Sequence, residues 1–295
     1  TAPYRRPGSK ALGQSVEQAF RKGCDVVILQ NHGVMAGGQS LKDALDKLEK
    51  LERLARICTT AAQAGAALTP PACVAVRDVQ AEIEARPRFA PEEPDARECD
   101  ARAQVAAWAN RAYEMGHCTA FSGCFAVRVS GHSFIINPQR HDRQALLPED
   151  TVLVSCGKIE AGKTPDPHVL LAEQVFSQQP ETIGFIAADP CGIMAFAVTD
   201  MAYQAAASPE SYGMLEDMQA LPYGAWQNDP ADTAGRLTPR RPALLVKNDC
   251  LMVTGTSVFN TFDCLEVCEF TAQTLLQAEA LGGVDAADRK RAGGA

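Results

Sequence analysis

The sequence predicts an α/β sandwich with a largely antiparallel central sheet. Strand-like and helix-like segments mix along the 295 residues without the regular alternation that a doubly wound parallel sheet requires. Hydrophobic residues make up 46% of the chain, which is enough for a substantial core. The third observation is a segment of 25 residues that occurs twice. The two copies are therefore expected to share one local fold.

The repeat pairs residues 31–55 with residues 248–272 without a gap, at an offset of 217 positions. Nine of the 25 positions are identical, where average composition would give about one or two by chance. The copies differ where chemistry would be located, because the first reads Asn31-His32-Gly33 and the second reads Asn248-Asp249-Cys250. The first copy thus keeps a histidine that can bind a metal ion.

The elements of the first copy follow from local patterns. Residues 9–21 are predicted to be helical, residues 25–30 to form a buried strand, and residues 34–36 to form a second short strand after a turn at 31–33. Ser40 and Asp43 predict a capping box, and the apolar residues after it favour one broad face of a helix of about seven turns.

Proline and acidic residues between positions 65 and 94 break the periodicity, which indicates a linker with a short helix near 79–85. The patterns beyond it predict a helix, a hairpin, a strand, a helix and a strand before the second repeat copy. Their ranges are 95–115, 120–136, 151–155, 167–177 and 183–187.

The repeat also predicts a domain organisation. The second copy closes a long segment that begins near Arg97, and the equivalent start for the first copy would lie about 120 residues before Thr1. We expect residues 1–66 to be the C-terminal part of a first domain and residues 67–95 to be a linker. Residues 96–284 are expected to form a complete second domain, followed by a tail at 285–295.

Charge and hydropathy narrow the classes of partner. The net charge is −8 and the isoelectric point is near 5.2, which disfavours nucleic acid and anionic membranes as partners because both favour a basic surface. No apolar run approaches the roughly 20 residues of a membrane span, and the N-terminal residues lack the apolar core of a signal peptide. A cytoplasmic location and small-molecule or protein partners are expected.

The eleven cysteines are an odd number, and no Cys-x-x-Cys sequence occurs. Disulfide frameworks are typical of small secreted domains, so reduced and mostly buried thiols are the expectation for this long acidic chain.

Residues 157–164 match the phosphate-loop pattern G-x-x-x-x-G-K-[ST] and follow a predicted strand. That mechanism needs Lys163 and Thr164 to open a helix whose amides face the phosphate. Pro165 and Pro167 follow at once, and prolines there remove donors and disfavour helical geometry. A polar loop is therefore favoured over a nucleotidase site.

Several motifs resemble those of the class II aldolase/adducin family. Residues 4–55 resemble its C-terminal part, and residues 97–283 resemble a whole domain, so the resemblance covers nearly all of the chain outside the linker. It implies an α/β/α sandwich with a largely antiparallel sheet. The motifs are Pro7-Gly8-Ser9, Asn31-His32-Gly33, Ser122-Gly123, Ile135-Ile136-Asn137-Pro138, Leu147-Pro148-Glu149-Asp150, Gly162-Lys163-Thr164-Pro165 and Pro180-Glu181.

In catalytic members of the family, three histidines hold Zn²⁺ or a similar divalent ion, and a nearby glutamate moves the proton. The ion then permits C–C cleavage of a sugar or sugar phosphate without a Schiff base. The resemblance implies that His32 is the third ligand. An ordinary polar hairpin turn is the alternative explanation for His32, because Asn-x-Gly is common between two strands.

The second domain departs from the family pattern at the positions of its metal ligands. Ala187-Ala188-Asp189 stands where His-x-His is expected, Asp249 replaces the turn histidine, and His168 replaces the glutamate. Cys124 and Ala126 replace the Asn and Ser of the phosphate loop, and Gln139-Arg140 replaces its Ser-Gly. His168, Asp189 and Asp249 could form a weaker, oxygen-rich cation site; drift in an unused site is the alternative.

The resemblance implies a metal-dependent aldehyde-lyase that acts on sugars or sugar phosphates and has a degenerate second domain. A related decarboxylase is a variant of this hypothesis, and a non-catalytic scaffold such as adducin is the competing one. Family members are usually oligomers with active sites at subunit contacts, so a homo-oligomer is expected.

Overall fold

The structure is a computed structural model, and it describes residues 1–71, 73–205, 209–215 and 218–282. The chain divides into two compact units, Thr1–Arg56 and Ile57–Ala295. Each unit is described by itself. The tail expected at 285–295 lies outside the described residues.

The first unit consists of a helix, a hairpin and the start of a long helix. Helix α1 (Lys10–Arg21) begins at Ser9, whose side chain accepts a hydrogen bond from the amide of Leu12. Strands β1 (Val26–Leu29) and β2 (Gly33–Ala36) pair antiparallel, and α2 (Leu41–Gln63) follows them. A small core forms where Ala2, Val27 and Leu29 pack against one face of α1. These elements lie within one or two residues of the predicted ranges.

The second unit is built on a nine-stranded sheet with the order β3-β7-β6-β5-β4-β8-β11-β10-β9. Only the outermost pairs, β3 with β7 and β9 with β10, are parallel. The largely antiparallel sheet predicted from the sequence is therefore confirmed. The strands are β3 (Arg88–Phe89), β4 (Cys124–Ser130), β5 (Ser133–Ile136), β6 (Val152–Ser155), β7 (Lys158–Glu160), β8 (Gly184–Ala188), β9 (Gln219–Leu221), β10 (Ala243–Val246) and β11 (Leu251–Gly255).

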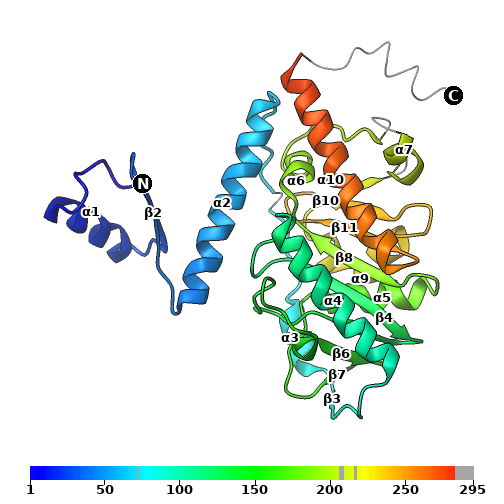
Figure 1. The fold of residues 1–295 in the computed structure, drawn as a ribbon. Helices are drawn as coiled ribbons and strands as arrows, with labels where there is room; N and C mark the ends of the chain where they lie inside the picture. The colour runs from blue at the N-terminus through cyan, green and yellow to red at the C-terminus, as the bar shows by residue number, and fades with distance from the viewer. Residues whose placement is uncertain (72, 206–208, 216–217, 283–295) are drawn as a thin grey trace. The chain divides into compact units, whose positions relative to one another are not determined.

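Helices cover both faces of this sheet (Figure 1). One face packs against α4 (Ala96–Glu114), α6 (Cys191–Ala197), α7 (Pro209–Leu215) and α10 (Val258–Ala280). The other packs against α3 (Val79–Ala85), α5 (Val169–Gln178), α8 (Ala225–Asn228) and α9 (Pro230–Arg236). Alternate strand residues face the two layers, as the period of a strand requires; Phe125 belongs to the first core and Ala126 to the second. The α/β/α sandwich is confirmed.

The two repeat copies have the same backbone course. Each begins in the turn of an antiparallel hairpin, β1–β2 for the first copy and β10–β11 for the second. The following helix then starts in the same way: the amide of Asp43 donates to the Ser40 hydroxyl, and the amide of Asn260 donates to the Ser257 hydroxyl, both over 3.1 Å. The Asp43 carboxylate accepts a hydrogen bond from the amide of Gln39 at 2.9 Å. In a standard capping box it would accept from the amide of Ser40, one residue later.

The segment expected to be a linker contributes structure to the second unit. Residues 79–85 form α3, whose Ile83 is completely buried, and residues 88–89 form β3. The backbone of Arg77 and the backbone of Ala75 are bound to the side chain of Asn228. The proline and charge content of this segment predicts a linker, but the burial of Ile83 and the pairing of β3 attach it to the second unit.

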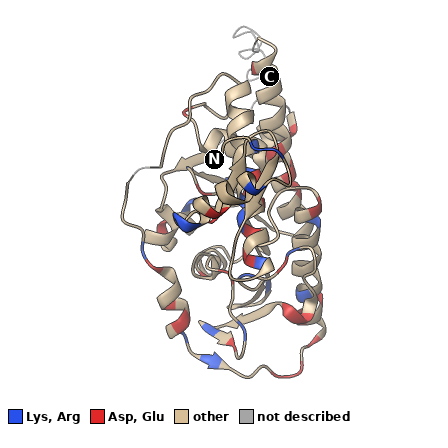
Figure 2. Cartoon of the chain, turned by 90° about the vertical axis from the view of Figure 1, so that its left-hand side faces the viewer, with Lys and Arg blue, Asp and Glu red and all other residues tan. Residues whose placement is uncertain are grey.

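The described helices include none long and apolar enough to cross a membrane. All eleven cysteines are free. Five of them are buried, two are half-buried and four are exposed, so fewer are buried than the sequence predicted. Figure 2 shows Lys and Arg interspersed with Asp and Glu along the chain, an arrangement typical of a mixed-charge surface.

Candidate functional site

One end of the large sheet gathers polar residues from several strands. Strand β4 begins at Cys124, β8 is followed by Asp189, and the turn between β10 and β11 carries Asp249. Cys124 pairs with Ala187, and the start of β11 pairs with the end of β8. The antiparallel register therefore brings residues far apart in the sequence to the same edge.

A buried asparagine organises the backbone at this edge. The side-chain carbonyl of Asn137, which is fully buried, accepts from the amide of Phe125 at 2.6 Å, and its NH₂ group donates to the carbonyls of Gly123 and Pro138. Its backbone carbonyl accepts from the amide of Asp166 at 3.0 Å. Asn137 thus connects the start of β4, the end of β5 and the loop that leads into α5.

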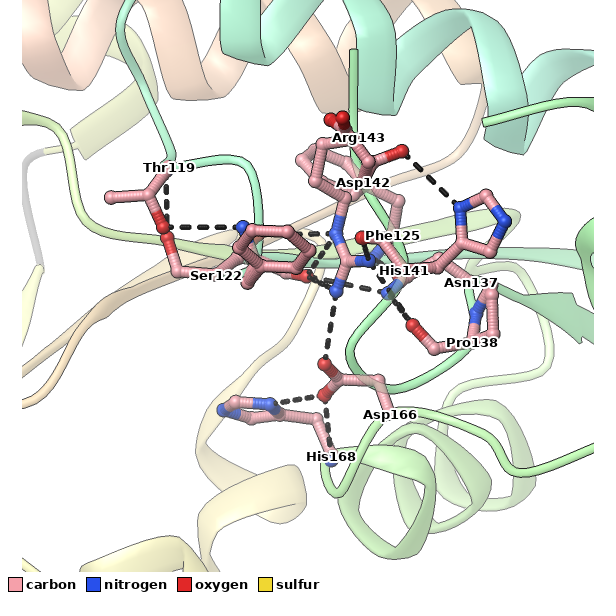
Figure 3. A network of polar contacts seen from close by, with 12 residues as sticks. Thr119, Ser122, Phe125, Asn137, Pro138, His141, Asp142, Arg143, Asp166 and His168 are labelled. Atoms are coloured by element: carbon pink, nitrogen blue, oxygen red, sulfur yellow. Dashed lines mark hydrogen bonds and ion pairs between the residues drawn. The ribbon is translucent and has the colours of Figure 1, made fainter. Parts of the chain in front are cut away.

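The guanidinium of Arg143 is completely buried beside Asn137 (Figure 3). It is surrounded by acceptors and forms an ion pair with Asp166 at 3.5 Å. A charge in such a place is stable only when it is paired and fully hydrogen-bonded, and this one is. The carbonyl oxygens that accept from it belong to Ser122, Gly123, Pro138 and His141.

Asp166 and His168 form a close pair in the loop before α5 (Figure 3). One oxygen of Asp166 accepts from the backbone amide of His168 at 3.0 Å and lies 2.8 Å from its Nδ1. Burial opposes the charged form of both groups, but their hydrogen bond and mutual attraction outweigh it. The pKa of Asp166 is therefore lowered, with a contribution from Arg143, and the pKa of His168 is raised, with a contribution from Asp249.

The indole ring of Trp226, in α8, stacks on the imidazole of His168 with the ring centroids 4.2 Å apart. Its Nε1 donates to Asp249 at 2.8 Å, and the Gln227 side chain donates to the same oxygen at 3.3 Å. The Nε2 atom of His168 is buried and has no hydrogen-bond partner. The imidazole is thus held by stacking on one face and by Asp166 at Nδ1.

A cavity of about 610 Å³ adjoins Trp226 and Pro167. Its volume is in the range of small-molecule sites. Arg77, Gln80 and Arg140 also line it. Arg140 has a φ of 52°, in the left-handed region that is uncommon for residues with a Cβ atom. The cavity joins the loop before α5 to the segment before α3.

The three residues proposed from the sequence as an oxygen-rich cation site lie at the same end of the sheet, with different partners. Asp189 accepts from the Ser122 hydroxyl at 3.1 Å, and Asp249 is bound by Trp226 and Gln227. Within the described part of the chain, the residues whose ligand atoms all lie within 4.8 Å of one another are Cys124, Asp166 and His168. Of the sequence candidates, only His168 belongs to this trio.

Sequence reasoning did not select Cys124 and Asp166 as a pair with His168. The sequence does single out Cys124, as a departure from the family motif that follows Gly123. Asp166 stands two residues before His168, so it is close to a candidate residue in the sequence. Their proximity depends on the backbone bond between Asp166 and Asn137, which joins parts of the chain that no sequence pattern relates.

His32 lies in the first unit, at the exposed turn between β1 and β2. Asn31 before it has a φ of 55°, and the backbone amide of His32 donates to the carbonyl of Leu29 at 3.1 Å. The turn thus presents the imidazole of His32 at the surface of this unit. Among the residues described, no group of three metal-ligand side chains includes it.

The phosphate-loop pattern at residues 157–164 forms β7 and a turn, and α5 begins only at Val169. Lys163 donates to the carbonyls of Glu149 and Thr151 and pairs with Glu160 at 2.8 Å. Its ammonium group therefore binds the protein itself, and Lys163 does not lie at the start of α5. This geometry favours the polar loop over a nucleotide site.

A comparison with protein families finds one match that covers most of the chain. A family model described as the class II aldolase and adducin N-terminal domain matches residues 1–59 and 103–276. The chain belongs to the class II aldolase and adducin family. The match includes both repeat copies and every residue of the Cys124, Asp166 and His168 trio.

Solved structures of the family share the fold. YgbL from Klebsiella pneumoniae is 18% identical with a TM-score of 0.56, covering 66% of this chain and 98% of that one. L-fuculose-1-phosphate aldolase from Thermus thermophilus is 20% identical with a TM-score of 0.54, covering 64% and 99%. L-fuculose 1-phosphate aldolase from Glaciozyma antarctica is 18% identical with a TM-score of 0.55, covering 79% and 86%. Comparison with curated proteins gives no match.

Class II aldolases are typically metal-dependent, which raises the question of whether the residues present here fit a metal ion. In the second unit, Ala187 lies near the end of β8, Asp189 follows that strand and Asp249 lies in the β10–β11 turn. Alanine has no donor atom, and both carboxylates already accept hydrogen bonds from the protein. These three residues therefore do not supply a three-histidine site.

Proposed function

We propose that the protein is a class II aldolase-like protein with tandem domains, in which residues 1–66 are the C-terminal part of a first domain. Residues 67–95 would connect it to a degenerate second domain at 96–284. The support for this proposal is the repeat, whose two copies share a hairpin, a left-handed asparagine and a serine-capped helix. Because the copies share these features, one family domain is the simplest template for both.

The first domain is proposed to be a metal-dependent aldehyde-lyase that cleaves a C–C bond in a sugar or sugar phosphate. His32 would hold the ion from the hairpin turn, as one of several ligands. The ion, when bound, would supply Lewis-acid polarisation of substrate oxygens. The observation that supports this role is a difference between the two repeat copies. The hairpin turn of the first copy has the exposed His32, whereas the equivalent turn of the second has Asp249, which accepts a hydrogen bond from Trp226.

The second domain is proposed to be catalytically inactive as an aldolase. Ala187 has no donor, and the residue in the place of the proton-transferring glutamate is His168, which is engaged by Asp166 at Nδ1. Arg143 is bound to the carbonyls of Gly123 and Pro138, beside the residues that resemble the family's phosphate loop, and it pairs with Asp166. We propose that this internal ion pair replaces a substrate anion. We place the protein in the cytoplasm and propose that this domain supports a homo-oligomer.

A non-catalytic scaffold is the second candidate, and the losses at Ala187, Asp189 and Asp249 favour it. The two functions differ in the metal content of the first domain. A scaffold needs no ion at His32, whereas an aldehyde-lyase does.

The test is elemental analysis of the purified chain, together with any residues that its gene encodes before Thr1, with and without His32→Ala. His132→Ala is the matched control, because His132 is an exposed histidine in the β4–β5 turn. Metal lost only with His32→Ala, together with cleavage of L-fuculose 1-phosphate or another sugar phosphate, would support the lyase. Metal content that is unchanged by His32→Ala would favour the scaffold.

A further inference from the structure

The trio formed by Cys124, Asp166 and His168 has the geometry of a metal centre. Its three ligand atoms lie within 4.8 Å of one another. The ligands of a tetrahedral zinc ion are separated by roughly 3.5 Å, because each stands at about 2.0–2.3 Å from the ion. Small side-chain adjustments would therefore place all three atoms around one ion.

We propose that Cys124, Asp166 and His168 bind a divalent transition-metal ion such as Zn²⁺ in the second unit. Thiolate, imidazole and carboxylate together are a donor set suited to zinc, and three protein ligands leave a fourth position open. This site is separate from the function proposed for His32, and it uses none of the three positions that hold the family's histidines.

The register of the sheet explains how a thiol would replace a lost imidazole. Cys124 is the direct cross-strand partner of Ala187, the position of the first histidine in His-x-His. Both residues belong to the core on the same face of the sheet. Cβ atoms of such partners lie about 4.5–5.5 Å apart. A ligand atom from β4 therefore reaches nearly the same place as one from β8.

The supports of the trio are rigid. Cys124 is completely buried within the sheet, and Asp166 is only 7% exposed. The amide of Asp166 is bound to Asn137, and the stacked Trp226 fixes the ring of His168. A metal site needs its ligands held in this way by neighbouring groups.

The electrostatic environment also suits a cation. The carboxylates of Asp189 and Asp249 lie near enough to Cys250 to raise the pKa of its thiol, after the larger effect of burial, and Asp249 also acts on His168. Arg143 opposes them, but its guanidinium is paired with Asp166 and hydrogen-bonded to backbone carbonyls. Asp189 and Asp249 therefore add negative potential at this edge of the sheet, which favours a divalent ion.

A hydrogen-bonded trio without metal is the competing explanation. In that case the proton of the Cys124 thiol and the proton on Nδ1 of His168 both point at Asp166. A metal ion would displace these protons, since thiolate and neutral imidazole are the binding forms. The Nε2 atom of His168 is buried without a hydrogen-bond partner, and this observation does not distinguish the two explanations.

The two explanations are separated by titrating the chelator-treated full chain with Co²⁺ and recording its absorption. Thiolate coordination gives a charge-transfer band in the near ultraviolet, and tetrahedral geometry gives intense visible bands. We expect one equivalent of Co²⁺ to bind with both signatures and Zn²⁺ to displace it. The Cys124→Ala and His168→Gln variants should lose the thiolate band or weaken binding at least about 100-fold.

Two matched controls test the assignment. Cys250→Ala removes a second buried thiol next to Asp249, and His117→Gln removes a second buried histidine; both should keep the band. His32→Ala should also keep it, which separates this site from the one proposed in the first unit. Circular dichroism establishes that each variant is folded. A folded wild-type chain without a thiolate band, or a band that survives Cys124→Ala, would overturn the proposal.

Discussion

Asn31 and Asn248, 217 positions apart, occupy the same left-handed corner of two equivalent hairpins, with φ angles of 55° and 58°. Asparagine tolerates this conformation better than other residues with a Cβ atom. The second corner is also tied to the core, since the amide of Asn248 donates to the carbonyl of Ala197 at 3.1 Å. The identity of these two residues is thus explained by backbone geometry.

Asn248→Ala is predicted to destabilise the second unit by about 1 kcal/mol, because the left-handed conformation brings the Cβ atom of alanine too close to a carbonyl oxygen. Asn248→Gly should change the free energy of unfolding much less, since glycine has no Cβ atom to clash. Urea unfolding followed by circular dichroism measures both. Equal losses for alanine and glycine would mean that a side-chain contact, and not the φ angle, is important here.

Gly255 and Gly38 are the second matched pair in the repeat. A Cβ atom on Gly255 would lie 2.7 Å from the backbone nitrogen of Thr261, and one on Gly38 would lie 2.7 Å from that of Ala44. In both copies the end of the hairpin therefore packs directly on the first turn of the following helix.

Gly255→Ala is predicted to destabilise the protein by about 1–3 kcal/mol, because the contact is with backbone that cannot rotate away. Gly213→Ala is the control: it lies in α7, and nothing is within 4 Å of the added atom. We expect that change to be neutral or slightly stabilising in thermal unfolding. Similar losses for both variants would contradict the steric explanation.

The sequence was informative where the signals are local. The hairpin at residues 26–36 and the helix after it follow from a buried apolar run, Asn-x-Gly and a serine cap, and the structure has these elements within a residue or two. The repeat extends the same prediction to residues 248–272. The resemblance to the family supplied the sandwich architecture, which the comparisons bear out.

The remainder depended on long-range contacts. Strand β3 is a strand only because β7 lies beside it, and Arg143 is buried although arginine is ordinarily exposed. The pairing of Cys124 with Asp166 likewise requires the loop before α5 to return to Asn137. No spacing in the sequence indicates that Cys124 lies close to Asp166, so the candidate metal centre can be identified only from the structure.

Arg143→Met is predicted to cost about 3–5 kcal/mol of unfolding free energy, because it leaves Asp166 and several carbonyls buried without a cationic donor. Arg140→Met is the matched control. Arg140 is exposed and close in sequence, and its replacement should stay within about 0.5 kcal/mol. Chemical unfolding of the two variants measures the difference. A small loss for Arg143→Met would show that the loop can rearrange around an apolar side chain.

Glu160 is the centre of a second buried ionic group, at the end of β7. One oxygen accepts from Arg102 and from the amide of Leu153, both at 2.9 Å, and the other pairs with Lys163 at 2.8 Å. Burial alone would raise the pKa of Glu160, but the hydrogen bonds from Lys163, Leu153 and Arg102 outweigh it and lower the pKa from its ordinary value. The carboxylate therefore stabilises the folded state above the unfolded pKa, and this contribution is lost as pH falls through the folded pKa.

Glu160→Gln should consequently reduce the unfolding free energy by about 3 kcal/mol at pH 7, since two cations lose their buried partner. The difference from wild type should shrink as the pH falls below the usual pKa of glutamate, about 4.3, because the unfolded chain then binds a proton that the folded wild type still resists. Glu266→Gln, which removes the partner of the more exposed Arg111, should cost no more than about 1 kcal/mol. Denaturant unfolding from pH 7 to pH 3 measures all three proteins. A loss that stays constant over that range would assign the effect of Glu160→Gln to packing, because a charge effect must follow the titration of the carboxylate.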